Sequence, residues 1–149
     1  QSLGDVPVTL AGLNHSERIR QLAKLPVRIT GQLPSLENLY GEARVFIAPT
    51  RFAAGIPLKI LEAAAKGLRV VATALLAEQL SWTDREMAIA TDAESFAARC
   101  VEVYTDAARW TSLREGALER IRKEYAPQMF EQSVRAVLEG RRPARAAVS

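Results

Sequence analysis

Two charged side chains at the start of a predicted helix give this sequence its clearest chemistry. Lys59, Glu62 and Lys66 share one face of the helix expected between Pro57 and Gly67. The first-turn amides of a helix lack intrahelical partners and carry the positive end of its dipole, so a phosphate group can dock there. Lys59 would add a full positive charge. Glu62, one turn later, is well placed to accept hydrogen bonds from ribose hydroxyls.

The same side chains also fit an ordinary exposed helix face. Lys59–Glu62 and Glu62–Lys66 pairs would each contribute only about 0.2–0.5 kcal/mol. Spacing alone favours this surface interpretation over a phosphate site.

A strand, a loop, a helix and a second strand are expected to position these residues. The apolar run Val45–Ala48 ends at Pro49 and predicts a strand buried on both faces. Pro57 fits the first helical position, where its missing N–H costs nothing, and Gly67 marks the end of the helix. Val70–Ala72 predicts a second strand. So short a connection implies parallel strands with a right-handed crossover.

This stretch resembles the donor-binding motif of the GT-B glycosyltransferases, and more narrowly that of the family 4 retaining enzymes of the group 1 type. The similarity rests on Pro49–Phe52, the run Gly55–Ala65, and Gly67 with Val70–Thr73. The loop Gly31–Pro34 resembles the one that these proteins place against the nucleobase. The similarity continues more weakly through the C-terminal helices. Because of this resemblance, the phosphate site is preferred over the surface interpretation for Lys59 and Glu62.

The resemblance implies a role for each matching residue. Glu62 corresponds to the second glutamate of the E-x7-E motif, which binds the donor ribose, and Lys59 to a diphosphate and donor-sugar contact; both are assigned to catalysis. Position 54 should hold the first glutamate, but here it is Ala54, as in relatives with a Gly/Ala-rich loop followed by a lysine. The complete donor-binding set comprises Gly31, Gln32, Arg51, Ala54, Gly55, Ile56, Pro57, Leu58, Lys59 and Glu62.

The fold that the resemblance implies is α/β and Rossmann-like, a mostly parallel sheet flanked by helices, with a helical C-terminal part. Residues 1–140 would form part of a C-terminal nucleotide-sugar-binding domain, and residues 141–149 a basic mobile tail. The parent enzyme would transfer a hexose from a UDP- or GDP-sugar to a glycan, a lipid-linked sugar or a similar acceptor, in polysaccharide biosynthesis. It would need neither metal nor cofactor.

Further elements follow from periodicity and capping residues. Strands are expected at Val8–Ala11, Val27–Thr30 and Met87–Ala90. Helices are expected from Ser16 to about Leu25, over Leu36–Tyr40, after Asp92, after Asp106 and over Met129–Leu138.

The family's usual donor domain carries an extra strand and helix before the strand that corresponds to Val8–Ala11, and an acceptor-binding N-terminal domain precedes it. Nothing in Gln1–Val6 can supply them. We therefore expect a fragment of a longer enzyme. The fragment should be inactive, and should either self-associate or pair Val8–Ala11 directly with Val45–Ala48 through their open edges. The parent would be cytoplasmic, and peripheral association with the inner face of the membrane is compatible with this.

Composition limits the other functions. With 149 residues and 48% apolar residues the chain can form one domain, and no apolar run approaches a membrane span. One cysteine, Cys100, and one histidine, His15, exclude an internal disulfide and the usual zinc frameworks. Basic residues are scattered and aromatics make up 6%, so we expect no nucleic-acid partner.

The alternative function is a non-catalytic, flavodoxin-like signalling or interaction domain. It would need an acidic cluster at the strand ends, and Asp5, Asp84 and Asp92 do not fall there. A Rossmann dehydrogenase is disfavoured because no G-x-G-x-x-G follows any expected strand. Binding of UDP or GDP, as opposed to a response to an acyl phosphate, would separate these possibilities.

Overall fold

The computed structural model describes residues 3–13, 16–24 and 26–141. The chain divides into two compact units, Gln1–Glu42 and Ala43–Ser149, and each is described by itself. His15 and all but the first residue of the expected basic tail lie outside the described residues.

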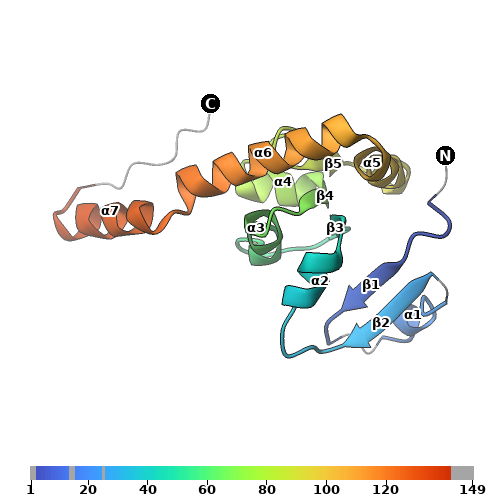
Figure 1. Cartoon of the computed structure of the whole chain (residues 1–149). Coiled ribbons are helices and arrows are strands. Elements are labelled where there is room, and N and C mark those ends of the chain that lie inside the picture. Colours follow the sequence, from blue (N-terminus) through green and yellow to red (C-terminus); the bar gives the residue numbers. More distant parts are fainter. Residues whose placement is uncertain (1–2, 14–15, 25, 142–149) are drawn as a thin grey trace. The chain divides into compact units, whose positions relative to one another are not determined.

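The first unit contains two parallel strands and two short helices (Figure 1). Its elements are β1 (Val8–Ala11), α1 (Glu17–Arg20), β2 (Val27–Gly31) and α2 (Glu37–Glu42). Strand β1 pairs with β2, Val8 opposite Val27. Ser16 caps α1 as predicted, but the helix ends at Arg20 rather than near Leu25. None of its residues is buried, so it lacks the packing that would extend so short a helix.

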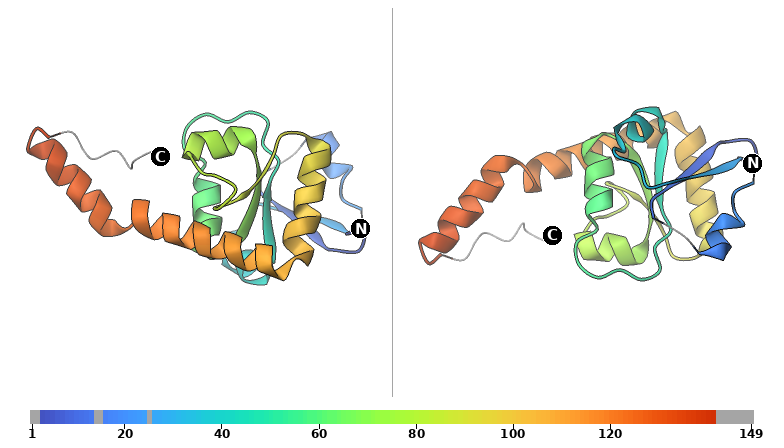
Figure 2. Two further views of the ribbon diagram at one scale, coloured as in Figure 1. Left: turned by 90° about the horizontal axis from the view of Figure 1, so that it is seen from above. Right: turned by 90° about the horizontal axis from the view of Figure 1, so that it is seen from below.

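The second unit is a three-stranded parallel sheet with helices on both sides (Figure 2). The strands lie in the order β3-β4-β5, with α3 and α4 on one side and α5 on the other. The elements are β3 (Val45–Ala48), α3 (Leu58–Ala65), β4 (Arg69–Thr73), α4 (Ala74–Leu80), β5 (Ala88–Ala90), α5 (Ala93–Thr105), α6 (Ala107–Glu124) and α7 (Pro127–Leu138).

Strand β4 forms the centre of the second unit. It pairs with β3 on one side and β5 on the other, and Val70, Val71 and Ala72 are completely buried. Val103 of α5 and Leu113 of α6 pack against Val71 in one apolar cluster. Burial of such side chains stabilises the fold by roughly 1.5–3 kcal/mol each.

The predicted fold class is confirmed. The described strand pairs are all parallel, helices flank them, and α5, α6 and α7 form a helical C-terminal part. Within each unit the described strands pair with one another, β1 with β2 in the first unit and β4 with β3 and β5 in the second. No helix within the described residues is both long and apolar enough to cross a bilayer.

Two aspartates begin the long helices, as the sequence predicts. The carboxylate of Asp92 accepts a hydrogen bond from the Ser95 amide at 2.7 Å in a reciprocal capping box, and these bonds lower the pKa of Asp92. The carboxylate of Asp106 caps α6 by accepting from the amides of Ala108 and Arg109, at 2.9 and 3.0 Å. Cys100 packs beside the apolar cluster, and burial raises the pKa of its thiol. The thiol is therefore protonated at neutral pH, in accord with an inert cysteine.

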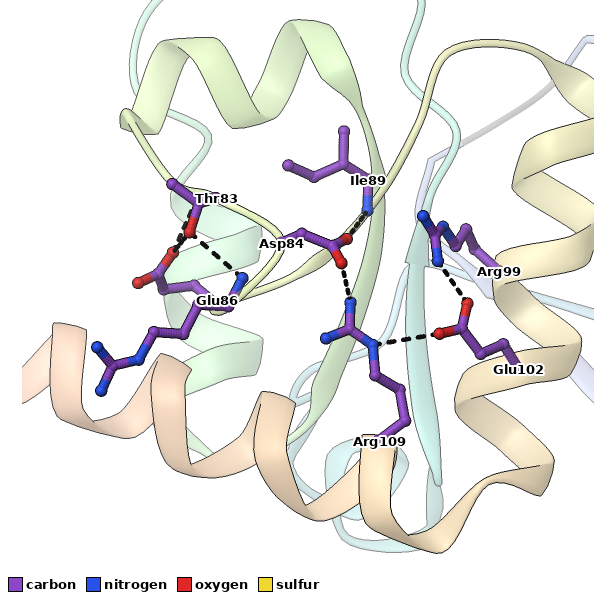
Figure 3. Close-up of polar contacts among 8 residues, drawn as sticks. Thr83, Asp84, Glu86, Ile89, Arg99, Glu102 and Arg109 are labelled. Carbon is purple, nitrogen blue, oxygen red and sulfur yellow. Dashed lines mark hydrogen bonds and ion pairs between the residues drawn. The ribbon is translucent and has the colours of Figure 1, made fainter.

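A chain of ion pairs fastens the loop before β5 to the two helices that follow (Figure 3). Asp84 pairs with Arg109 of α6, which reaches Glu102 of α5 at 3.3 Å. Glu102 also accepts from Arg99 at 2.7 Å. Ion pairs near the surface typically contribute about 0–1 kcal/mol each, so this network mainly fixes the orientation of the loop.

The turn in this loop also contacts α6 directly. The buried carboxylate of Glu86 accepts from the amide and the hydroxyl of Thr83, at 2.7 and 2.8 Å. Gly116 of α6 faces the same turn, and a Cβ built there would lie 2.3 Å from the carbonyl oxygen of Arg85. Only a residue without a side chain permits so close an approach.

We expect Gly116→Ala to lower the free energy of unfolding by about 1–3 kcal/mol, because the methyl group would force α6 and the turn apart. Elsewhere in a helix the same change gains about 0.5–1 kcal/mol. Urea unfolding measures the difference, and Ser112→Ala on the exposed face of α6 is the control. Unchanged or increased stability of Gly116→Ala would contradict the close approach.

Candidate functional site

The site is built where strands β3 and β4 end. Ala48 lies opposite Ala72 in the parallel register, so both strands end at the same edge of the sheet. The loop 49–57 leaves β3 at this edge and leads into α3. Thr73, the last residue of β4, is also the N-cap of α4. Ligands of open α/β sheets bind at such carboxyl edges.

Lys59 is held in place by Thr50. Its Nζ donates to the Thr50 hydroxyl at 3.0 Å. The Thr73 hydroxyl donates to the Thr50 carbonyl oxygen at 2.8 Å, and Thr73 makes no side-chain cap to α4. Thr50 therefore links the end of β4 to the ammonium group at the start of α3.

The rest of the loop has one further anchor and an open surface. Gln79 of α4 donates its Nε2 to the Ala53 carbonyl oxygen at 3.0 Å. Gly55 has a φ of 77°, in the left-handed region that favours glycine. Phe52 is 92% exposed, and Ile56 and Leu58 are also exposed. The segment that leads to Lys59 thus exposes several apolar side chains.

Contrary to the prediction, Pro57 does not occupy the first helical position. It is the N-cap of α3, with φ −78° and ψ 74°, angles typical of an inverse γ-turn. The Leu58 amide accordingly donates to the Ile56 carbonyl oxygen at 2.9 Å, just outside the helix. In this conformation the Leu58 amide is therefore not among the first-turn donors that could bind a phosphate. The proline's fixed φ fits the turn as well as it fits a helix.

The predicted division of α3 into a buried and a polar face is confirmed in part, because Leu58 and Ala65, which helical spacing predicts to face inward, are exposed. Ile60, Leu61, Ala63 and Ala64 are buried, whereas Lys59 and Glu62 are exposed. Gly67 and Leu68 donate to the carbonyl oxygens of Ala64 and Ala63, at 2.9 and 3.0 Å. These two bonds end the helix in a Schellman motif.

The structure brings together the predicted residues of the loop and helix. Eight of them belong to the second unit: Arg51, Ala54, Gly55, Ile56, Pro57, Leu58, Lys59 and Glu62, of which Pro57 is buried and the others are exposed. Gly31 and Gln32 belong to the first unit. There Gly31 ends β2 and accepts from the Gly12 amide at 2.8 Å, and Gln32 is exposed.

Sequence reasoning missed the residues that support the site. Thr50, Thr73 and Gln79 contact the loop or Lys59, but none was given a role. The two threonines could have been found by aligning the expected parallel strands, because hydroxyl side chains then follow both strands at one edge. Gln79 gives no such signal, since its loop contact lies 26 residues away.

The assembled groups suit an anionic ligand. Lys59 offers an ammonium group fixed by one hydrogen bond, and Glu62 offers an exposed acceptor one turn later. No group of three histidine, cysteine, aspartate or glutamate side chains within the described residues could hold a metal ion.

Comparison with known proteins identifies the family and the fold. The model of the family described as glycosyl transferases group 1 matches residues 1–106. No curated protein sequence matches the chain significantly. Among solved structures, Anabaena HepE with UDP-glucose is 15% identical with a TM-score of 0.76, over 93% of this chain and 42% of that one.

Two further structures are similar. Sucrose-phosphate synthase from Thermosynechococcus elongatus is 23% identical with a TM-score of 0.68, over 89% of this chain and 38% of that one. Pneumococcal O-GlcNAc transferase GtfA, in complex with UDP and GlcNAc, is 14% identical with a TM-score of 0.71, over 91% and 29%. At these identities the likeness shows a shared Rossmann-like GT-B fold.

The chain spans less than half the length of each of these proteins. The family match covers more than two thirds of this chain, including the strand, loop and helix that carry Lys59 and Glu62. The chain belongs to the family of group 1 glycosyl transferases.

Proposed function

We propose that this chain binds a nucleotide diphosphate sugar, UDP- or GDP-linked, and serves as the donor-binding part of an enzyme that transfers the sugar to a glycan, a lipid-linked sugar or a similar acceptor. The observation that carries the proposal is the fixed ammonium group of Lys59. It lies at the start of α3, beside the carboxyl ends of β3 and β4, and is held by Thr50.

Lys59 would contact the diphosphate. In a glycosyl transfer the bond between the anomeric carbon and the diphosphate oxygen breaks, and its electron pair leaves with the diphosphate. The acceptor hydroxyl forms the new bond and loses its proton. Positive charge placed beforehand at the departing oxygens stabilises this transition state. A nearby ammonium supplies such charge, and the loop Gly55–Leu58 would complete the contact with the diphosphate and sugar.

Glu62 would accept hydrogen bonds from the ribose hydroxyls. It is exposed one turn after Lys59 on the same face of α3, so one nucleotide could reach both side chains. Arg51 would add a second positive charge from the loop. Ala54, where relatives with the E-x7-E motif have a glutamate, leaves the donor-sugar contacts to the surrounding loop.

Gly31 and Gln32 would contact the nucleobase, by resemblance to the family. The solved structures support a uridine nucleotide as the first candidate, since HepE was crystallised with UDP and with UDP-glucose. We further propose that an acceptor-binding domain acts together with this chain, because the chain covers 42% of HepE.

Lys59→Ala should weaken the binding of UDP more than the binding of uridine, because only UDP carries the diphosphate. A lost charge-assisted hydrogen bond is worth about 1.5–3 kcal/mol, or at least about tenfold in the dissociation constant. Calorimetric titration of the chain with both ligands measures the two losses. Lys66→Ala, which removes the same charge from the end of the same helix, is the control. Equal losses for UDP and uridine would argue against a phosphate contact.

Glu62→Ala should weaken UDP and uridine equally, by about tenfold, because both carry the ribose. The fold should persist, since the side chain is exposed. The same titration tests this, with thermal unfolding as the check on stability. Unchanged affinity for both ligands would return Glu62 to a surface role.

Thr73→Val keeps the shape of the side chain and removes the hydroxyl that holds Thr50. We expect about 1 kcal/mol lower stability and faster hydrogen exchange of the amides of residues 50–56. Thr111→Val is the control, because the Thr111 hydroxyl donates to a carbonyl oxygen within its own helix. Exchange that is equally slow in wild type and Thr73→Val would show that this bond does not order the loop.

A further inference from the structure

Three arginines lie close together where the strands of the second unit's sheet begin, and two of them stack on one indole ring. Arg44 precedes β3, Arg69 begins β4, and Arg114 lies one turn after Trp110 on α6. The register places Val45 opposite Arg69, so Arg44 and Arg69 leave the sheet at its amino edge. The donor site described above lies at the carboxyl edge.

Trp110 is the centre of this group. The Arg69 guanidinium lies over its ring, and that of Arg44 lies 5.1 Å from the ring centroid. Arg69 Nε donates to the Trp110 carbonyl oxygen at 3.2 Å, and Nη1 donates to the Gly67 carbonyl oxygen at 3.0 Å. A Cβ built on Gly67 would lie 3.2 Å from Arg114 Nε, so Arg114 reaches the same place.

No carboxylate neutralises these three charges in the described part of the chain. The ion pairs there serve other arginines, among them Arg85, Arg99, Arg109 and Arg120. The stacked indole gives only a modest attraction to each cation, about 0.5–2 kcal/mol. Three like charges therefore share one site without a counter-ion of their own.

Arg69 shows the consequence most clearly. Its side chain is only 6% exposed, and its buried Nη2 has no hydrogen-bond partner among the described residues. Burial and the charges of Arg114 and Arg44 lower the pKa of Arg69 to about 10, so it is still protonated at neutral pH. A buried charge without a counter-ion is unfavourable, and a bound anion would relieve it.

We propose that Arg44, Arg69 and Arg114 form a second anion site, for a phosphate group. The planar guanidinium presents paired N–H donors that match phosphate oxygens. Arg44 and Arg114 are exposed and would touch the ligand, while Arg69 supplies charge from beneath them. The phosphate could belong to a soluble molecule or to a lipid headgroup, since both present the same oxygens.

The indole N–H of Trp110 provides a local reporter. It donates to the Arg44 carbonyl oxygen at 3.4 Å, inside the group. The chain has two tryptophans, and the other, Trp82, is buried after α4. Titration of the 15N-labelled chain with inorganic phosphate should shift the Trp110 indole resonance and leave that of Trp82 in place. Trp110→Phe assigns the signal, and Lys59→Ala should leave the shift unchanged.

Arg44→Gln with Arg114→Gln should weaken the phosphate response about tenfold or more, since each lost charge-assisted contact is worth about 1.5–3 kcal/mol. The matched control removes two exposed charges elsewhere on α6, by Arg122→Gln with Lys123→Gln, and should bind as the wild type does. If the double variant fails to fold by circular dichroism, Arg114→Gln alone makes the same test.

Vesicles distinguish the source of the phosphate. The chain is sedimented with vesicles of phosphatidylcholine alone and of phosphatidylcholine with phosphatidylglycerol. Binding only to the vesicles with phosphatidylglycerol supports a lipid headgroup, provided that the double variant does not bind them and that phosphate competes with the binding. Phosphate binding without vesicle binding supports a soluble ligand. Failure of both probes, or equal binding by the double variant and its control, would overturn the site.

Discussion

The pairing of β4 on both of its edges is the constraint on which the second unit depends. Val70, Val71 and Ala72 are buried there, and hydrogen bonds to β3 and β5 fix the strand along its length. A strand held in this way delivers its terminal residues to fixed places. Thr73 reaches the loop before α3 at one end, and Arg69 reaches α6 at the other.

The charged groups at the two ends of β4 have different surroundings. At the carboxyl edge a single exposed ammonium group is held by a neutral hydroxyl, so its charge is free to meet a ligand. At the amino edge a guanidinium is buried among other guanidinium groups. The first arrangement needs little reorganisation to bind an anion, whereas the second stores unfavourable charge that an anion would compensate.

The sequence predicts most of the second unit because its elements follow local rules. Apolar runs locate β3 and β4, the periodicity of Ile60 and Leu61 divides α3 into two faces, and aspartates mark the starts of α5 and α6. Local rules are weaker where two conformations suit one residue. Pro57 fits a helix start and an inverse γ-turn equally well, and α1 ends early because nothing packs against it.

Contacts between distant residues could not be predicted in the same way. The hydroxyl of Thr73 is aimed at a carbonyl oxygen 23 residues earlier, and Arg69 meets a carbonyl oxygen 41 residues later. No periodicity encodes either contact: the first depends on how β3 and β4 align, and the second on which helix crosses the start of β4.

Gly55 shows what limits variation in the loop. A Cβ added there would meet no atom within 4 Å, yet its φ of 77° is one that L-amino acids rarely adopt. An L-methyl group would therefore find open space, but the backbone angle is unfavourable for an L-residue and favourable for a D-residue. A D-alanine introduced by chemical synthesis would therefore preserve the turn and restrict its motion, whereas an L-alanine of the same size would strain it. Handedness, rather than room, restricts which residue can occupy this position of the loop.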